Sequence, residues 1–571
     1  MTTLVARPLR NHRTGEQRQQ VLATQHLRLM VVMLLFAAGV LVVLLRLVQL
    51  GITEGDDRDS RVAMTAPRGD IVDRNGSPLA RTIDAWTIGV HPKKLIGDPA
   101  EIAQKLADLM PDKGDQPWFY AQITKPVSFT YLNRRASPAL VEAVNAIGEP
   151  GIVFERETQR LYPQSTMAAH VLGFISGNHG MSGIERALDD RLSQAAATGQ
   201  PVALSIDSRV QAAMESELGR AMTTFSARGG GGIVLDVHTG EVLAMVSLPT
   251  FNPNRVGMAG SEQLRNITTQ SVFELGSTFK PITMAAAIDN GVVTSMERRF
   301  DATHPLQVGR FTIHDERGDP KRWLNMAETL IYSSNVATAR VADEVGPQRM
   351  QAMFRKLGFD TRPDIELREK GRPLWPGFWA RTTTMTTAYG HGIAVTPLHL
   401  ANAYAALVNG GTWRPATLLK VQPGHEAAGR RVISEATSLR MRQMLRLIVM
   451  RGTGRKGDAP GYRVGGKTGT AEAAVAGGYD RSRNVATFAA AFPMDAPRYV
   501  VLAMLDSPLG TKETFGWKTA AWNAAPVVGR TIARVGAILG VMPDDHRDID
   551  VSDILPTLWQ DPDQAPKSGG Q

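Results

Sequence analysis

One unbroken apolar run lies near the amino terminus. From Leu29 to Leu45 the sequence is LMVVMLLFAAGVLVVLL, and after Arg46 two further apolar residues extend the run to Val48. A run of this length can cross the hydrocarbon layer as a helix, with the Arg46 side chain reaching the headgroups. A core helix would show a polar face, and a cleaved signal peptide would have a shorter apolar run followed by a small-residue cleavage site. The pattern therefore predicts an uncleaved membrane anchor at residues 29–48.

The charges on either side of this run predict its orientation. Residues 1–28 hold five arginines against one glutamate, whereas residues 54–59 hold four acidic side chains and one arginine. Positive charge is retained on the cytoplasmic side, so we expect residues 1–28 to be a cytoplasmic tail. No second run of comparable length follows. The pattern is typical of a single-pass protein whose body lies outside the cytoplasm.

The first part of that body, residues 49–205, mixes short strand-like runs with turns. One clear helical stretch covers residues 100–109. Asn75-Gly76 indicates a tight hairpin turn, because glycine adopts the positive φ that such a turn requires. No single hydrophobic period dominates this part. We interpret residues 49–205 as a pedestal for binding or spacing rather than as a reaction centre.

The second part, residues 206–544, has strand patterns at both ends and helices between them. It begins with an amphipathic helix near Val210 and two strands that meet at Thr239-Gly240. A helix-rich stretch covers residues 277–411, and strand patterns return between residues 462 and 505. This order predicts an α+β fold in which distant segments assemble one sheet and helices pack on it.

Composition narrows the possible chemistry. The chain has no cysteine, which excludes disulfides, cysteine-ligated zinc and thiol nucleophiles. The net charge is +9, but the basic residues are spread out instead of clustered, so we expect no nucleic-acid partner, while anionic lipid remains open. We expect no metal and no cofactor. Residues 545–571 are polar and rich in Asp and Pro, and we expect them to be a mobile tail.

Ser277 and Lys280 form the first candidate chemical pair. On a helix these positions share one face, and Pro281 is tolerated only in a first turn, so the helix should begin close to Ser277. That position also places Ser277 at the positive end of the helix dipole. A serine needs a base to act as a nucleophile, and Lys280 can be that base if burial or a nearby cation lowers its pKa. By itself the spacing also fits a surface serine and lysine on one helical turn.

Ser333 and Asn335 form the second candidate pair. If both face a cleft, the hydroxyl can relay a proton and the amide can hold a peptide group through its donor and its acceptor. In isolation, the tripeptide Ser333-Ser334-Asn335 fits a helix cap or a turn better than a catalytic role.

The third candidate is a strand-like segment that contains Lys467, Thr468, Gly469 and Thr470. The lysine and the two threonines suit the binding of a substrate carboxylate, and Gly469 allows the backbone to approach a ligand closely. Lys467 also supplies a second cation that would lower the pKa of Lys280, so we expect Lys280 to be largely neutral. A phosphate loop shares the lettering, with Gly461 in the required place, but it requires a helix after the lysine, and glycines follow instead.

These three motifs in this order resemble those of penicillin-binding proteins and serine β-lactamases. Longer stretches such as APRGDIVDRNGSPLA, GEVLAMVSLPTFNPN and HGIAVTPLHLANAYAALVNGG resemble class B penicillin-binding proteins, and more closely the division-specific peptidoglycan D,D-transpeptidases of the FtsI type. The resemblance implies a single transmembrane helix, an elongated mixed α/β pedestal of the dimerisation type, and a transpeptidase domain. That last domain would resemble a β-lactamase, with helices packed on an antiparallel sheet.

The resemblance also implies a role for each matched residue. Ser277 would attack the penultimate D-Ala carbonyl of a stem peptide, release the terminal D-Ala and form an acyl-enzyme. Lys280 would take the Ser277 proton, Ser333 would pass a proton to the leaving amine, and Asn335 would hold the substrate amide. The residues that would bind the terminal carboxylate and adjoining backbone are Lys467, Thr468, Gly469 and Thr470.

The implied surroundings follow from the same resemblance. The substrates would be peptidoglycan stem peptides, β-lactams would acylate the same serine, and the body would lie in the periplasm beside the inner membrane. No polymerase module is evident in the sequence, so glycan polymerisation would come from a multi-pass septal glycosyltransferase of the FtsW type, working with other division proteins.

Three alternatives remain open at this point. An elongation-specific class B relative would share nearly all of this chemistry. A β-lactamase or β-lactam sensor would need a residue that activates water, and no glutamate between Asn335 and Lys467 can be assigned to that role. A non-catalytic division scaffold would not require an intact nucleophile, base and carboxylate site.

Overall fold

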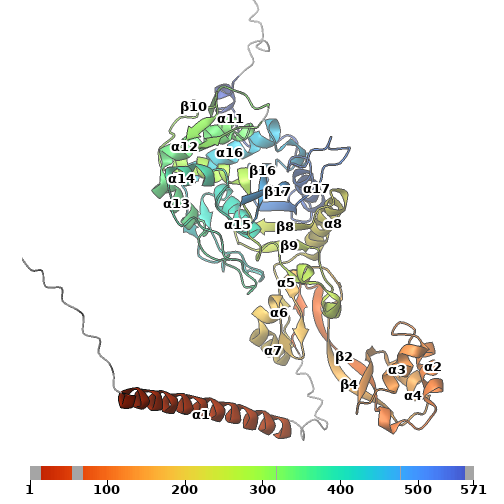
Figure 1. Cartoon of the computed structure of the whole chain (residues 1–571). Coiled ribbons are helices and arrows are strands. Elements are labelled where there is room, and N and C mark those ends of the chain that lie inside the picture. The colour runs from red at the N-terminus through yellow and green to blue at the C-terminus, as the bar shows by residue number, and fades with distance from the viewer. Residues whose placement is uncertain (1–14, 54–67, 317, 476–477, 560–571) are drawn as a thin grey trace, which may run out of the picture. The chain divides into compact units, whose positions relative to one another are not determined.

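The computed structural model describes residues 15–53, 68–316, 318–475 and 478–559, in two separate units (Figure 1). The unit of residues 1–65 contains one continuous helix, α1 (Gly15–Thr53). Its segment Leu27–Arg46 has a mean hydropathy of 2.7 and none of it is buried. Length and composition therefore suit a membrane span, as the apolar run predicted. Residues 1–14 of the expected cytoplasmic tail lie outside the described residues.

The pedestal is built on a mixed five-stranded sheet. Strands β3, β2, β1 and β7 follow one another, and β4 pairs with β2 along its length. The bounds are β1 (Ile71–Val72), β2 (Pro78–Val90), β3 (Thr130–Ala136), β4 (Ile152–Leu161) and β7 (Val202–Ala203). A small core of its own lies between this sheet and three helices, α2 (Pro99–Leu109), α3 (Gln116–Ile123) and α4 (Pro138–Asn145). The helix predicted at residues 100–109 is α2.

The turn predicted at Asn75-Gly76 is present between β1 and β2. Gly76 has φ +89°, which an L-residue rarely adopts. One carboxylate oxygen of the buried Asp73 accepts from the main-chain N–H groups of Asn75 and Ser77, each at 2.8 Å. The Asp73 side chain therefore stabilises the turn through these two hydrogen bonds.

Smaller elements connect the pedestal to the second part of the body. They are α5 (Ala169–Leu172), β5 (Ile175–Ser176), β6 (His179–Gly180), α6 (Gly183–Ala187) and α7 (Asp189–Thr198). The largest hydrophobic core runs through both parts, because Ile71 and Tyr162 belong to the same buried cluster as Ile233. A domain boundary at residue 205 stays a prediction.

The second part is organised by an antiparallel five-stranded sheet in the order β16, β17, β18, β8, β9. Strands β8 (Gly229–Asp236) and β9 (Val242–Leu248) come from its beginning. Strands β16 (Gly465–Val475), β17 (Gly478–Phe492) and β18 (Tyr499–Asp506) come from its end. The prediction of one sheet assembled from distant segments is therefore confirmed.

Helices cover both faces of this sheet (Figure 1). Side chains alternate between the faces along each strand, so Val234 joins one core cluster while Ile233 joins the other. On the first face lie α8 (Ser208–Thr224) and α17 (Ala524–Val535). On the other lie α15 (Pro397–Val408) and α16 (Glu435–Arg451), with the remaining helices beyond them. The remaining helices are α9 (Ser261–Leu264), α10 (Lys280–Asp289), α11 (Met326–Ile331), α12 (Asn335–Val345), α13 (Pro347–Lys356) and α14 (Arg381–Thr387).

Short strand pairs complete the second part, and 3-10 turns occur in both parts. Its strand pairs are β10 (Arg299–Asp301) with β13 (Trp323–Asn325), β11 (Leu306–Val308) with β12 (Phe311–Ile313), and β14 (Thr412–Trp413) with β15 (Arg430–Arg431). The 3-10 turns are η1 (Pro92–Lys94, in the pedestal), η2 (Pro253–Met258), η3 (Gly276–Phe279), η4 (Arg455–Gly457) and η5 (Leu555–Thr557).

The expectation of a mobile tail is wrong for residues 545–559. Ile549, Val551 and Ile554 are buried in the main core, although acidic residues separate them in the sequence. The carbonyl of Thr557 accepts from the side chains of Arg299 and Asn325, at 2.7 and 2.9 Å. Scattered single apolar residues gave no period from which this packing could be predicted. Residues 560–571 lie outside the described residues.

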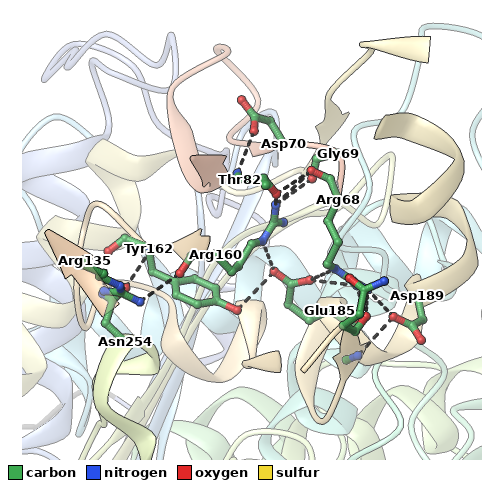
Figure 2. A network of polar contacts seen from close by, with 12 residues as sticks. Arg68, Gly69, Asp70, Thr82, Arg135, Arg160, Tyr162, Glu185, Asp189 and Asn254 are labelled. Atoms are coloured by element: carbon green, nitrogen blue, oxygen red, sulfur yellow. Dashed lines mark hydrogen bonds and ion pairs between the residues drawn. The ribbon is translucent and has the colours of Figure 1, made fainter. Parts of the chain in front are cut away.

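A buried polar network joins the pedestal segments around Glu185 (Figure 2). One oxygen of this carboxylate accepts from Arg160 Nε at 2.7 Å and from the Tyr162 hydroxyl at 3.2 Å. The other accepts from Arg68 Nε at 3.1 Å, and Arg68 also pairs with Asp189 at 2.6 Å. A carboxylate that holds two buried guanidinium groups cannot be removed without leaving uncompensated charge.

We therefore expect Glu185→Ala to lower the free energy of unfolding by about 3–5 kcal/mol. Denaturant unfolding of the full chain in detergent measures this loss, with Glu142→Ala, at an exposed position of α4, as the matched control. A Glu185→Ala variant as stable as the control would show that this network contributes little to the fold.

Candidate active site

The nucleophile candidate lies where a 3-10 turn meets a helix. Ser277 is in η3, and Lys280 and Pro281 are the first two residues of α10, so the predicted helix start is correct. Gly276 has φ +56°, and a Cβ at this position would lie 3.0 Å from the carbonyl oxygen of Thr470. The absence of a side chain thus lets the turn lie directly against strand β16.

The second candidate is both a helix cap and part of the cleft. Ser334 is the N-cap of α12, with its Oγ accepting from the Ala337 N–H at 3.0 Å. Ser333, just before it, has φ +62°, a strained backbone for a residue with a side chain. The Asn335 amide donates to the His314 carbonyl at 3.0 Å. Ser334 is therefore a helix cap, whereas Ser333 and Asn335 line the cleft.

Asp315 holds this turn in place, and the sequence analysis did not identify it. Its carboxylate accepts from the Ser334 hydroxyl at 2.7 Å and from the main-chain N–H groups of Asn335 and Val336 at 2.5 and 2.9 Å. An acidic residue at the start of a helix satisfies otherwise unpaired N–H groups. The contact spans a loop, so no local spacing in the sequence indicated it.

Two lysine amines converge on the hydroxyl of Ser333. Lys467 Nζ donates to Ser333 Oγ at 2.9 Å, and Lys280 Nζ donates to the same oxygen at 3.1 Å and to the Ser333 carbonyl. Both lysines are fully buried. Ser277 and Ser333 both line the same cleft. Among the described residues, however, Lys280 donates to Ser333 and has no hydrogen bond to Ser277.

Burial lowers the pKa of both amines. The pKa of Lys280 falls to about 8, because desolvation outweighs the opposing charges of Asp315, Asp319 and Glu316. Burial also holds the pKa of Lys467 well below its usual value, and the charge of Lys280 lowers it further. The predicted effect of Lys467 on the pKa of Lys280 is not seen: burial lowers that pKa, whereas the charge of Lys280 acts on Lys467. The titrations of the two amines are therefore coupled.

The third motif lies on strand β16, antiparallel to β17. A strand rather than a helix follows Lys467, which is inconsistent with a phosphate loop. A Cβ at Gly469 would lie 2.3 Å from the Leu275 carbonyl oxygen, so this glycine is required for contact with the nucleophile segment. Thr468 Oγ1 bonds to Thr453 Oγ1 at 2.7 Å, and Thr470 Oγ1 accepts from the Ala520 N–H at 3.1 Å.

A cleft of about 150 Å³ connects the three motifs. The predicted residues that line it are Ser277, Ser333, Asn335, Thr468 and Thr470. The lining residues that the sequence analysis missed include Glu316, Asp319, Tyr332, His391, Thr453 and Thr519. The charged run that begins at His314 was the only local signal, and it covers only Glu316 and Asp319. Burial and the charge of Asp315 raise the pKa of Asp319 to about 6.

This arrangement suits acyl transfer through a serine. It combines a hydroxyl at a helix start, two amines with lowered pKa values that share one bridging hydroxyl, and hydroxyl and amide groups around a cleft. Within the described residues, no group of three His, Asp or Glu side chains is placed to hold a metal ion.

Comparison with known proteins agrees with this chemistry. The family model of the penicillin-binding protein transpeptidase domain matches residues 230–527, and that of the penicillin-binding protein dimerisation domain matches residues 63–201. Together the two matches include the pedestal and the three motifs.

Characterised relatives extend the similarity over most of the chain. The probable peptidoglycan D,D-transpeptidase FtsI of Caulobacter vibrioides is 42% identical over 485 residues, covering 83% of this chain and 82% of that protein. The peptidoglycan D,D-transpeptidase FtsI of Escherichia coli is 30% identical over 530 residues, covering 86% and 87%. The crystal structure of penicillin-binding protein 3 from Mycobacterium tuberculosis, complexed with aztreonam, has a TM-score of 0.66 at 28% identity, covering 84% and 98%.

Proposed function

This chain belongs to the class B penicillin-binding proteins, as a serine-type peptidoglycan D,D-transpeptidase of the FtsI type, and we propose that Ser277 carries its acyl transfer. The observation that supports this role is the position of Ser277 at the start of α10, in the same cleft as Ser333, whose hydroxyl accepts from both buried amines. We propose that the two amines share one proton in the free site, because burial lowers the pKa of both and the charge of Lys280 lowers that of Lys467 further. The substrates are peptidoglycan stem peptides, and β-lactams bind the same domain.

In the first half-reaction Ser277 Oγ attacks the penultimate D-Ala carbonyl. An ester forms between the serine and this carbonyl carbon, and the bond to the terminal D-Ala breaks. The Ser277 proton passes to Lys280, and the leaving amine receives a proton through the Ser333 hydroxyl, which lies within hydrogen-bond distance of both lysines. Asn335 positions the substrate amide from the cleft wall.

The substrate carboxylate selects which lysine keeps the shared proton. Lys467 and the threonines at 468 and 470 flank the position that this carboxylate would occupy on β16. A bound anion there favours the charged form of Lys467. The proton then moves from Lys280 to Lys467, and Lys280 becomes the neutral amine that the reaction requires. The base is therefore generated only when a carboxylate-bearing substrate is in place.

In the second half-reaction an amine from a neighbouring stem peptide attacks the ester carbonyl and forms the amide cross-link. The ester bond to Ser277 Oγ breaks, and the proton lost by the amine returns to Ser277 Oγ through the lysine pair. The main-chain N–H groups of Ser277 and Thr470 are the candidates for holding the carbonyl oxygen in both halves. Septal wall synthesis is supported by the similarity to FtsI proteins. An elongation-specific role is the alternative within the family, and an intact site argues against a purely structural scaffold.

A matched pair of serine variants tests the nucleophile. We expect Ser277→Ala to lower covalent labelling of the full chain by penicillin by several orders of magnitude, because Ser277 lines the cleft at the start of α10 and is the one serine of the sequence with a lysine three residues after it. Ser295→Ala, at an exposed position, is the control and should label like the wild type. Mass spectrometry of the labelled protein measures both. A penicilloyl adduct on the Ser277→Ala variant, or on any other residue, would contradict the assignment.

The protein is a single-pass inner-membrane protein, and we propose that its amino end is cytoplasmic and its body periplasmic. The arginine-rich residues before α1 support this orientation. We also propose that it works with a multi-pass glycosyltransferase of the FtsW type. The side chains of Leu27–Arg46 are all exposed within this chain, so a membrane partner can pack against them.

The charged pedestal residues Arg68, Asp70, Asp73 and Arg74 are a second candidate for docking on that partner, with internal salt bridges as the alternative role. Each charged side chain there has an internal contact. Arg68 pairs with Glu185, Asp70 with Arg81 at 2.9 Å, and Arg74 with Glu241 at 3.5 Å. Asp73 closes a turn. Structural roles thus account for these charges, and the docking proposal is restricted to the helix.

Replacement of residues 29–48 by an unrelated apolar helix of equal length tests this proposal. We expect membrane localisation and penicillin acylation to be retained, because they require only an anchor and an intact cleft. Glycan polymerisation by a reconstituted pair with the glycosyltransferase should fall, because the specific helix contact is lost. Unchanged polymerisation would show that α1 is only a tether.

A further inference from the structure

A second pocket, with a volume of about 410 Å³, lies in the transpeptidase part. It is formed by the end of α13, the loop after it, the first turns of α15, and strands β14 and β15. It shares no lining residue with the catalytic cleft. Three lining side chains are cationic and one is anionic, namely Arg362, Lys370, Arg430 and Asp364.

His399 lines this pocket and is only 4% exposed. Burial lowers its pKa to about 4, with the main chain of Thr361 offsetting part of the shift, so the ring is neutral. Its Nδ1 lies 3.3 Å from the Thr396 main-chain nitrogen and 2.9 Å from the Thr396 hydroxyl oxygen. The ring also has a hydrogen bond with the main chain of Thr361. His399 is therefore a partnered, neutral side chain in the wall of the pocket.

Trp413 supplies a buried hydrogen-bond donor without an acceptor. Its side chain lines the pocket, the residue is 8% exposed, and the indole N–H has no hydrogen-bond partner within the described residues. An indole nitrogen can only donate. The Arg430 guanidinium lies 3.6 Å from the centre of the ring, which fixes the plane of the ring.

The cations of the pocket are also poorly compensated. Arg430 donates from Nε to the Lys356 carbonyl at 2.7 Å. Neither Arg362 nor Lys370 forms an ion pair with a described residue, and Asp364 is the only carboxylate among the lining side chains. The pocket therefore combines a net positive charge with one buried N–H donor, that of Trp413, which has no acceptor among the described residues. Buried polar groups without partners are rare in folded proteins and require an explanation.

We propose that this pocket binds an oxyanion, either a carboxylate or a phosphate group of a small ligand. An oxyanion only accepts hydrogen bonds, so it complements Trp413 Nε1 and the three cations at once. The volume is within the range of small-molecule sites. Two sources of such a group are a peptide carboxylate and a phosphorylated compound.

The walls of the pocket also support the nucleophile segment. The ring of Phe359, in the loop after α13, lies 6.1 Å from His399 and 5.3 Å from Phe279, which is between Ser277 and Lys280. Tyr404, one turn further along α15, donates to the Thr278 carbonyl at 2.9 Å. An occupant would thus lie against residues that pack directly on the catalytic segment.

Calorimetric titration of the full chain in an uncharged detergent tests the proposal, with excess penicillin present to occupy the catalytic cleft. The two probes are inorganic phosphate and a peptidoglycan stem tetrapeptide. We expect Trp413→Phe, which removes the N–H and keeps the ring, and Lys370→Gln, which removes a charge, each to weaken binding about tenfold or more. The control is Lys93→Gln, with the same loss of charge at an exposed position of the pedestal.

The outcomes separate clearly. Binding of at least one probe that both pocket variants weaken and the control retains would support the site, and the tighter probe would identify the source of the oxyanion. Melting temperatures equal to the wild type would show that the variants are folded. Failure of both probes to bind at millimolar concentration, or binding that neither pocket variant changes, would overturn the proposal.

Discussion

Two ammonium groups cannot both stay charged in a site sealed from water, and the catalytic cleft is built around this constraint. Lys280 and Lys467 are fully buried and donate to the same oxygen, Ser333 Oγ. Desolvation lowers the pKa of both amines, and the charge of Lys280 lowers that of Lys467 further, which is the basis of the proposal that the pair holds one proton at neutral pH. The site therefore holds a base and an acid together without a histidine, and a substrate anion decides which lysine is which.

The fold brings these two amines to the hydroxyl of Ser333. Lys280 lies at the start of α10, Lys467 on β16 and Ser333 before α12, three segments far apart in the sequence. Glycines at 276 and 469 remove the side chains that would keep the helix start away from the strand. Ser333 adopts a strained backbone with positive φ at its position between the lysines. The Asp315 carboxylate holds the turn that follows through a hydrogen bond from Ser334.

Sequence predicted the parts that depend on local pattern. Pro281 placed the start of the helix, Asn75-Gly76 gave a turn, and alternation gave the strands of the sheet. Contacts across long separations were not predictable in this way. Asp315 is linked to Ser334 through a loop, and residues 549–558 pack through isolated apolar side chains. The member of the lysine pair that loses its proton depends on relative desolvation, which only the folded structure reveals.

The pH dependence of penicillin acylation by the free enzyme tests this account most directly. The second-order rate constant of acylation, measured at low penicillin concentration, reports the ionisation of the free enzyme. Because the active pair holds one proton, the rate should be maximal near neutral pH and fall as the last proton is lost, above the lowered pKa of about 8. A rate that instead rises steadily towards the ordinary lysine value of about 10.5 would show that Lys280 is an ordinary base and that the two amines do not share a proton.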